Sequence, residues 1–251
     1  MSGEKISHSP LAVIADIHGN RWALEAVLQD IDRRGIQQIV NLGDHLTGPL
    51  DPAGTADLLI ERGMLNICGN DDRVLFALPE ELSFSQRYTR EQVTEVHLNW
   101  LRVLPATAVI ADEVFACHGD LFDSAYLLEQ VEASGVFLRS TRAIEASAAG
   151  IAQPVILCGH SHLPRTVSLP QGRLIVNPGS VGLPAYTMEM PVAYAMESGS
   201  PHARYAILSP KLHSWQVEHV QVPYDWEYAA RVARGNQRSD WAEWLTTGRA
   251  Q

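Results

Sequence analysis

Five short apolar runs in this chain each lead into residues whose side chains can bind a metal ion. The residues that follow these runs are, in chain order, Asp16 with His18, Asp44, Asn70, His118, and His160 with His162. Short apolar runs of this kind are typical of buried strands in a parallel sheet. Because the carboxyl ends of such strands form the ligand-binding edge of an open α/β sheet, we expect these side chains to meet at one site.

The spacing of the apolar residues predicts an α/β fold. The first three runs alternate with helical patterns, of which the clearest places apolar residues at i, i+3, i+4 and i+7 from Leu24 to Ile31. Strands that alternate with helices over short connections imply a parallel sheet with right-handed crossovers. Two later pairs of runs read as antiparallel hairpins, at 107–110 with 114–117 and at 165–169 with 174–177. Two sheets packed face to face, with helices outside, would accommodate both kinds of strand.

The remaining segments complete the prediction of a single domain over 1–251, with its core at about 10–223 and a C-terminal helix and tail at 224–251. Helices are expected at 79–104, 124–131, 141–149 and 224–234, and further strands at 205–208 and 215–222. The connection 179–203 is rich in Gly, Pro and Ser, so we expect a long loop there. We expect the tail up to Gln251 to fray.

The composition excludes several classes of function. The formal net charge of −10 argues against binding extended nucleic acid, which needs clustered Lys and Arg. No apolar run approaches the ~20 residues that cross a membrane, and the first ten residues lack the apolar stretch of a signal peptide. The three cysteines do not form an even framework, which indicates a reducing compartment. The expected location is therefore the cytoplasm.

The candidate ligands are two carboxylates, one carboxamide and four imidazoles. This set exceeds what a single tetrahedral site uses, but it suits two adjacent divalent ions that share one carboxylate. Oxygen and nitrogen ligands without sulfur favour transition metals over calcium. Manganese is our first expectation for both ions, with iron, zinc, cobalt or nickel as alternatives.

The same residues form a series of motifs. These are Asp16-x-His18, Gly43-Asp44, Gly69-Asn70, His118-Gly119 and Gly159-His160-x-His162. In this order, over roughly 11–182, they resemble the calcineurin-like metallophosphoesterases. The segments Val176–Ser180 and Asp16–Asn20 are most similar to the small bacterial and archaeal phosphodiesterase branch. The resemblance implies an α/β fold in the form of a four-layer αββα sandwich, with two mixed β-sheets flanked by helices.

The resemblance also implies how two ions would be held. One ion would take Asp16, His18, Asp44 and His162. The other would take Asp44, Asn70, His118 and His160. Two ions can clamp an in-line displacement at phosphorus and lower the pKa of a bound water toward ~7, which supplies the attacking hydroxide.

One position departs from the family pattern. The family usually has Gly-Asn-His followed by Asp or Glu at the third motif, and that histidine is thought to protonate the leaving group. Here the segment is Gly69-Asn70-Asp71-Asp72. A free Asp has a pKa of ~3.9, so Asp71 is a poor general acid unless it is desolvated. We consider Asp71 and His45, which directly follows the bridging Asp44, as candidate catalytic residues.

Other polar residues lie beside the ligand loops. Asn20, Arg21 and Arg73 are candidates for binding substrate, and Asn177 is a candidate for orienting a ligand histidine or fixing the turn before Pro178. With only two arginines near the motifs, a monoester, which carries an extra negative charge, is less favoured than a diester. The expected partner is a small phosphorylated substrate, and the formation of a homo-oligomer is left open.

The sequence therefore predicts an enzyme that hydrolyses phosphodiester or phosphoanhydride bonds. Substrates whose leaving group needs little protonation fit best, such as aryl phosphodiesters, nucleotides or dinucleoside polyphosphates. One alternative is a phosphomonoesterase or phosphoprotein phosphatase of the same fold. A second is a scaffold protein with little catalytic activity, although buried ligand carboxylates would then have no evident use.

Overall fold

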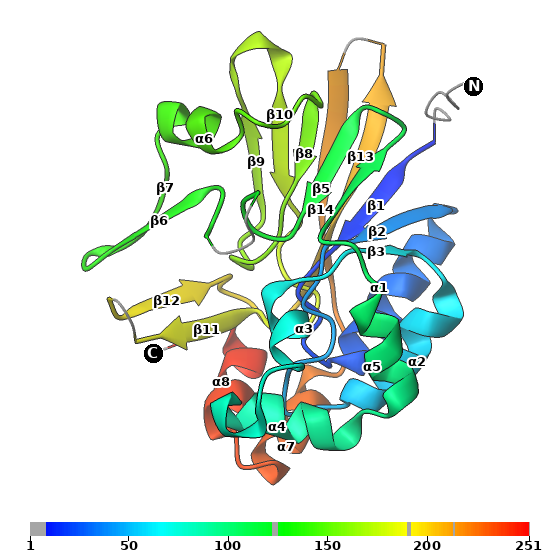
Figure 1. Ribbon diagram of the computed structural model, residues 1–251, viewed down its shortest axis with the longest axis vertical. Coiled ribbons are helices and arrows are strands. Elements are labelled where there is room, and N and C mark those ends of the chain that lie inside the picture. Colours follow the sequence, from blue (N-terminus) through cyan, green and yellow to red (C-terminus); the bar gives the residue numbers. More distant parts are fainter. Residues whose placement is uncertain (1–8, 122–124, 190–191, 213, 251) are drawn as a thin grey trace.

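The computed structural model describes residues 9–121, 125–189, 192–212 and 214–250. Within them, two five-stranded sheets pack face to face and carry helices on their outer faces (Figure 1). The four-layer αββα sandwich expected from the sequence is confirmed.

The first sheet contains the strands that lead into the first three motifs. Its order is β14–β13–β1–β2–β3. The strands are β1 (Leu11–Ile14), β2 (Gln38–Asn41), β3 (Leu65–Asn66), β13 (Ala203–Lys211) and β14 (Ser214–Val222). Strand β2 pairs in parallel with both β1 and β3, whereas β13 is antiparallel to β1. The loops that carry Asp16, Asp44 and Asn70 therefore leave the same edge of this sheet.

The second sheet contains the strands that lead into the histidine motifs. Its order is β4–β5–β8–β10–β9. The strands are β4 (Thr107–Ile110), β5 (Val114–Cys117), β8 (Val155–Leu157), β9 (Arg165–Ser168) and β10 (Leu174–Asn177). Both predicted hairpins, β4–β5 and β9–β10, are present, and β5, β8 and β10 run parallel. The loops that carry His118 and His160 thus also leave a common edge.

A hydrophobic core joins the two sheets. Buried side chains from the first sheet, such as Val13 and Val40, share one cluster with Val114 and Val155 of the second. Because the strands of both sheets are packed against each other along this cluster, the ligand loops at their ends are held in a fixed relation.

Helices cover the outer face of the first sheet (Figure 1). They are α1 (Arg21–Arg33), α2 (Pro52–Arg62) and α5 (Glu95–Arg102). Helix α1 buries Leu24, Val27 and Ile31, as its periodicity predicted. The outer face of the second sheet is covered by the shorter α6 (Thr141–Ser147) together with Leu127 and Leu128. None of the described helices combines the length and apolar character needed to cross a membrane.

The helical stretch predicted at 79–104 is divided into separate pieces. They are η1 (Pro79–Glu81), α4 (Phe84–Gln92) and α5, and they follow the short α3 (Asn70–Val74). Ser83 and Thr94 start α4 and α5 by accepting the backbone N–H three residues further on. These caps satisfy helix-end donors and break what the apolar pattern alone presented as one helix.

Two segments between the sheets' strands were predicted wrongly. Part of the expected helix at 124–131 is strand β6 (Glu129–Glu132), which pairs with β7 (Gly135–Leu138); Ser124 itself lies outside the described residues. The expected loop at 179–203 contains a hairpin of β11 (Ala185–Met188) and β12 (Tyr194–Glu197); residues 190–191 lie outside the described part. A further 3-10 turn, η2 (Pro170–Gly172), joins β9 to β10. The β6–β7 and β11–β12 hairpins depend on pairing and packing partners that a local pattern does not show.

The tail does not fray over its described length, contrary to the prediction. Helices α7 (Trp226–Gly235) and α8 (Ser239–Thr247) pack against each other at the lower end of the view in Figure 1. Helix α8 buries Trp241 and Trp244, and the N–H of Ala250 donates to the Glu197 carboxylate at 2.7 Å. Burial of two indoles stabilises this end of the chain against the β11–β12 hairpin.

Replacement of Trp241 tests this packing. Its side chain is buried in the α7–α8 cluster, and its ring meets that of His18 edge-on at 6.1 Å between centroids. We expect Trp241→Ala to lower the free energy of unfolding in urea by about 3–5 kcal/mol, the usual result of emptying an indole site. Leu212→Ala is the control, because Leu212 is 91% exposed and should change little. Equal stability of the two variants would contradict the assignment of α8 to the core.

Candidate metal centre

The predicted ligands meet at the common edge of the two sheets, where they form two groups. In each group the ligand atoms lie within 4.8 Å of one another. The first group is Asp16, His18 and His162, and the second is Asp44, His118 and His160. A third group, which overlaps both, combines His18 and Asp44 with Asp71. Asn70 adjoins the second group, since its Oδ1 lies 3.0 Å from Nε2 of His118. The fold thus brings all of the predicted ligand side chains together.

Asp44 stands between the two groups. Its Oδ2 lies 3.2 Å from Nε2 of His118 and 3.9 Å from Nε2 of His18. Gly69 makes this position accessible, because a Cβ there would overlap the Asp44 carboxylate. One carboxylate therefore faces imidazoles from both groups, as expected of a shared ligand.

Three imidazoles are oriented by backbone carbonyl groups. The Nδ1–H groups of His18, His118 and His162 donate to the carbonyl oxygens of Thr47, Leu42 and Leu183, at 2.9, 2.8 and 2.7 Å. A carbonyl oxygen can only accept, so Nδ1 carries a proton and, in the neutral ring, Nε2 keeps its lone pair. The Nε2 atoms of His18 and His162 lie 3.2 Å apart. Two lone pairs at this distance repel unless a proton or a cation lies between them, so this geometry fits a metal ion.

Backbone strain is concentrated at the same residues. Of the nine described non-glycine residues with positive φ, five are predicted ligands. They are Asp16 (55°), His18 (52°), Asp44 (55°), His160 (68°) and His162 (61°). This left-handed conformation is unfavourable for residues other than Gly and tends to occur at functional sites. The strain turns each side chain back over the end of its strand.

Asp72 holds the central loop in this conformation. Its buried carboxylate accepts the backbone N–H groups of Asp44, His45 and Gly69, each at 2.9 Å, and Nδ1–H of His45 at 2.7 Å. A carboxylate with several N–H donors is strongly stabilised. It fixes the loops after β2 and β3 to each other, and so positions Asp44 and Asn70.

Asp71 lies at the rim of the cluster. Its backbone N–H donates to Oδ1 of Asp44 at 2.9 Å, and its Oδ2 lies 3.8 Å from Nδ1 of His18. Its side chain is 26% exposed, so it can be reached from solvent. Burial among protein atoms and the adjacent Asp44 carboxylate raise the pKa of Asp71 to about 7.

The two central carboxyl groups have opposite proton affinities. Burial raises the pKa of Asp16 to about 8, although the nearby His118 opposes this shift. Burial also opposes ionisation of Asp44, but the surrounding imidazoles, His118 above all, hold its pKa well below the usual range. Asp44 is therefore the permanent negative charge of the centre.

The pKa values of the imidazoles are also shifted in opposite directions. Burial lowers the pKa of His160 to about 3 and that of His162 well below its usual value. Burial disfavours the charged form of His118 as well, but Asp44 outweighs it and raises the pKa of His118 to about 9. At neutral pH, His160 and His162 thus offer lone pairs, whereas His118 carries a proton that a cation must displace.

His45 is not brought to the cluster, which corrects its assignment as a catalytic candidate. The side chain is completely buried. Its Nδ1 is bound to Asp72, and its ring meets that of Trp100 edge-on at 5.2 Å. A side chain enclosed in this way has no route to a phosphoryl oxygen, and its contacts help to fix the Asp72 carboxylate.

The three predicted substrate-binding residues have other contacts. Asn20 is buried and caps α1, and its amide donates to the carbonyl of Gly182 and the hydroxyl of Tyr224. Both of its N–H bonds are used, so Asn20 shapes the loop. Arg21 is paired with Glu25 at 2.7 Å. The guanidinium of Arg73 contacts the carbonyl of Cys68 at 3.5 Å, so neither arginine is held in a phosphate clamp by these contacts.

Asn177 lies beneath the loop between His160 and His162. Its amide donates to the Gly159 carbonyl at 2.8 Å and to the Ser161 hydroxyl at 3.0 Å. These two residues flank His160, so Asn177 supports the histidine loop from the end of β10.

Two features of the site were not found from the sequence. Asp72 was read only as part of a departing motif, although an acidic residue at the third position of a helix is a recognisable capping signal. The rings of Tyr126 and Tyr186 lie 4.7 and 4.6 Å from those of His160 and His162. Neither has a local signal, because Tyr126 lies just before strand β6 and Tyr186 lies in the β11–β12 hairpin, and the sequence predicted neither strand pair.

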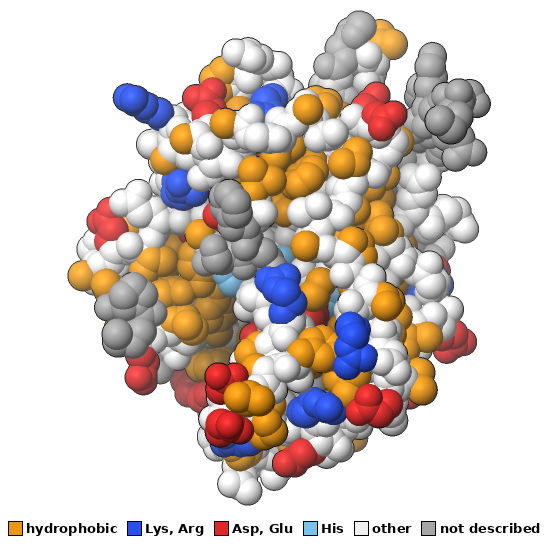
Figure 2. Space-filling model, viewed as in Figure 1, with side chains coloured by type: hydrophobic (Ala, Val, Ile, Leu, Met, Phe, Trp, Pro, Cys, Tyr) orange, Lys and Arg blue, Asp and Glu red, His pale blue; other side chains and the backbone are white. Residues whose placement is uncertain are grey.

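One face of the molecule is hollowed beside histidine side chains (Figure 2). Figure 2 shows histidine side chains at the base of a hollow, beside hydrophobic side chains that overlie the β11–β12 hairpin. Met188, the last residue of β11, and Val192, which precedes β12, are exposed apolar residues. The approach to the site is therefore partly apolar.

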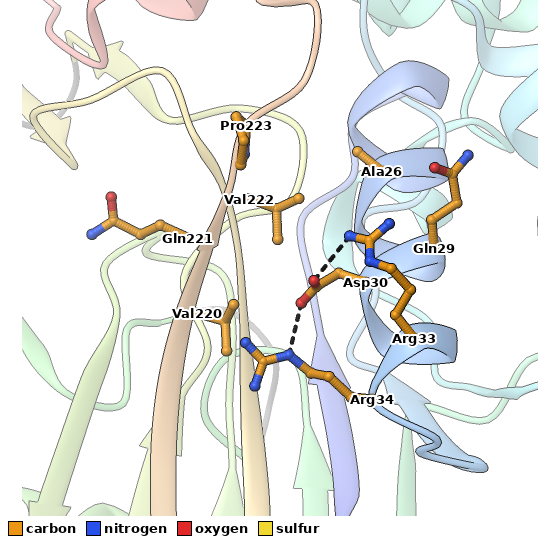
Figure 3. A pocket seen from close by; sticks show the side chains of 9 residues that line it. All are labelled: Ala26, Gln29, Asp30, Arg33, Arg34, Val220, Gln221, Val222 and Pro223. Atoms are coloured by element: carbon orange, nitrogen blue, oxygen red, sulfur yellow. Dashed lines mark hydrogen bonds and ion pairs between the residues drawn. The ribbon is translucent and has the colours of Figure 1, made fainter.

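A separate surface groove of about 210 Å³ lies between α1 and β14 (Figure 3). Asp30 accepts from Arg33 and Arg34 at its side, at 3.0 and 2.9 Å. None of the residues that line it is a predicted ligand, so it is distinct from the metal centre.

The sandwich and the His/Asp groups at its edge define a metallophosphoesterase. A model of the calcineurin-like phosphoesterase superfamily domain matches residues 10–198. The chain belongs to this superfamily, which confirms the resemblance seen in its motifs and makes it a phosphoesterase hydrolase.

Three similar proteins match this chain over at least 96% of its length. An uncharacterized protein of Methanocaldococcus jannaschii is 28% identical, over 96% of this chain and 99% of its own length. The crystal structure of a metallophosphoesterase from Sphaerobacter thermophilus matches with a TM-score of 0.74 and 23% identity, over 96% of this chain and 99% of that one. A hypothetical protein of Pyrococcus horikoshii matches with a TM-score of 0.75 and 18% identity, over 97% and 100%. These structures share the fold.

Substitution of Asp72 tests the bracing of the central loop. Asp72→Asn replaces one acceptor oxygen by an amide that cannot accept, which leaves buried N–H groups without partners. We expect the free energy of unfolding of the metal-free protein to fall by roughly 2–4 kcal/mol, measured with urea. Asp71→Asn is the matched control, since it leaves the hydrogen bonds of Asp72 intact. If both variants unfold like the parent, Asp72 does not brace the site.

Proposed function

We propose that this chain is a dinuclear-metal hydrolase of phosphodiester or phosphoanhydride bonds, with manganese as the native ion. The observation that carries the proposal is the pair of adjacent ligand groups that face each other across Asp44. One group offers Asp16, His18 and His162, and the other offers His118 and His160 with Asn70.

The residues present fit two divalent ions. Neutral imidazoles with free Nε2 atoms, one ionised carboxylate and a carboxamide oxygen are ligands that such ions accept. Bound there, the ions would neutralise charge on phosphorus-bound oxygens and lower the pKa of the attacking water. The carbonyl groups that hold the Nδ1–H groups of His18, His118 and His162 fix the orientation of these three imidazoles in advance, so little reorganisation of them is needed on binding.

The protein's own charges favour a diester or anhydride over a monoester. A monoester dianion is commonly gripped by arginines, whereas Arg21 and Arg73 here contact Glu25 and a backbone carbonyl. The apolar approach over β11–β12 suits a substrate with an aromatic or otherwise weakly polar leaving group. A small anionic substrate would still be drawn to a metal-loaded centre despite the net charge of −10.

Asp71 occupies the place where the family usually has a proton-donating histidine. Desolvation and Asp44 raise its pKa to about 7 in the metal-free site. Nearby cations stabilise the ionised form and lower this pKa again, so a loaded site has a weak proton donor. Leaving groups that depart without protonation are then favoured, which is why we place aryl diesters and polyphosphates ahead of alkyl diesters.

Comparison of an aryl with an alkyl phosphodiester tests the proposal. We expect turnover of bis(4-nitrophenyl) phosphate with manganese, and a much slower rate with an alkyl diester. Asp71→His should raise the alkyl rate selectively, toward the ~10²–10⁴-fold typical of general acid catalysis. Asp71→Asn controls for loss of the carboxylate alone.

Each rival function has its own outcome in this assay. Equal rates for aryl and alkyl diesters would refute the role given to Asp71. Faster turnover of 4-nitrophenyl phosphate than of the diester would favour the monoesterase. Tight metal binding without turnover of any ester would identify the scaffold alternative.

Metal binding should depend on pH in a defined direction. The pKa values of Asp16, about 8, and His118, about 9, lie above neutrality, so both groups release protons when an ion binds. We expect calorimetric titration to give two manganese ions per chain, with affinity rising from pH 6 to pH 9 by about tenfold per unit for each proton displaced. The buffer dependence of the heat counts these protons. Affinity that falls with rising pH would contradict the assignment of these ligands.

A further inference from the structure

Three tyrosine hydroxyl groups form a hydrogen-bonded chain beside His160. Tyr126 precedes β6, and Tyr186 and Tyr194 lie on β11 and β12. The hydroxyl oxygen of Tyr126 lies 2.8 Å from that of Tyr186 and 2.6 Å from that of Tyr194. Tyr186 donates in turn to the carbonyl oxygen of His160 at 3.2 Å.

The hydrogen bonds of these three tyrosines all run in one direction. Each tyrosine hydroxyl has a single proton, and that of Tyr186 is used on the His160 carbonyl. Tyr126 must then donate to Tyr186, and Tyr194 must donate to Tyr126. Three donors are thus aligned toward the backbone of one metal ligand, and each bond polarises the next.

The backbone of His160 needs such support. Its φ of 68° is in the left-handed region, which costs free energy in a residue with a side chain. The Asp16 carboxylate accepts its N–H at 3.1 and 3.2 Å, and Tyr186 binds its carbonyl group. Both peptide groups of His160 are therefore fixed, one by another ligand and one by the hairpin.

The tyrosine rings add a second contact. The ring centroid of Tyr126 lies 4.7 Å from that of His160, and the ring of Tyr186 lies 4.6 Å from that of His162. The segment that leads into β11 also supplies the Leu183 carbonyl that orients His162. The β11–β12 hairpin thus contacts both histidines of the Gly159–His162 motif.

We infer that Tyr186 is a positioning residue for the metal centre, which holds the His160 loop in its ligand geometry through its hydroxyl group. Tyr126 orients that hydroxyl by donating to it, whereas Tyr194 donates only to Tyr126. The inference rests on the proposed function in one respect only: the His/Asp cluster must bind metal, whatever substrate it acts on.

A cobalt titration tests the inference without an activity assay. Metal-free parent, Tyr186→Phe and Tyr194→Phe proteins are titrated with Co²⁺, and binding is followed by calorimetry and by visible absorption. Tyr186→Phe keeps the ring but loses the bond to His160. We expect the affinity for one of the two ions to fall about 10- to 100-fold, as for other groups that orient metal ligands, with a changed absorption band for that ion.

Tyr194→Phe is the matched control. It removes a phenolic hydroxyl from the same chain but leaves the bond between Tyr186 and His160, so affinity and spectrum should stay close to the parent. Tyr126→Phe is an independent variant that keeps the Tyr186 hydroxyl but removes the hydrogen bond that orients it. It should lower the affinity for the same ion by a smaller factor. Thermal unfolding of the metal-free proteins shows whether any loss of affinity merely follows lower stability.

The outcomes separate this inference from the proposed function. Parent-like cobalt affinity and spectrum in Tyr186→Phe would overturn the inference and leave the proposed function standing. An equal loss in Tyr186→Phe and Tyr194→Phe would also overturn it, because the bond to His160 would not be decisive. A parent protein that binds no cobalt would overturn both.

Discussion

The burial of carboxylates against imidazoles is the interaction on which the structure of this site depends. Asp16 and Asp44 are 0% and 2% exposed, and the charge that each carries when ionised costs several kcal/mol to bury without partners. The N–H groups of His160 and Asp71 and the imidazole of His118 offset this cost. The same crowding places imidazole lone pairs against each other, which is stable only with positive charge between them. A bound cation would remove this repulsion and stabilise the buried carboxylates, so the packing of the cluster itself favours metal binding.

The protein meets this demand with backbone conformation. Five ligand residues have left-handed φ values, and each follows a strand whose neighbours are packed between two sheets. A rigid strand and a strained turn together fix a side chain more accurately than a flexible loop could, because the strand cannot relax to relieve the turn. Asp72 and Tyr186 act at this level, since both bind backbone groups of the ligand loops. Stability and ligand geometry are therefore coupled through the same hydrogen bonds.

The sequence predicted what is local and missed what depends on contact between distant segments. An apolar run followed by Asp, Asn or His is visible in a few residues, so the sequence could predict the two sheets and the side chains that meet at their common edge. Tyr126 and Tyr186 are sixty residues apart in sequence and meet only after two hairpins have formed. Residues 129–131 of the stretch predicted as helical belong instead to strand β6, because they pair with β7, a partner that a local pattern does not show. Asp72 had a local signal, but its four donors come from two different loops.

The part of the chain beyond residue 198, where the match to the family model ends, is integral to the site. Strand β13 lies between β1 and β14 in the first sheet, directly beside the strand that leads into Asp16 and His18. The ring of Trp241 in helix α8 contacts that of His18 edge-on. The backbone N–H of Ala250 donates to the carboxylate of Glu197 at the end of the β11–β12 hairpin. One layer of C-terminal packing therefore supports both the first ligand motif and the hairpin that contacts the last.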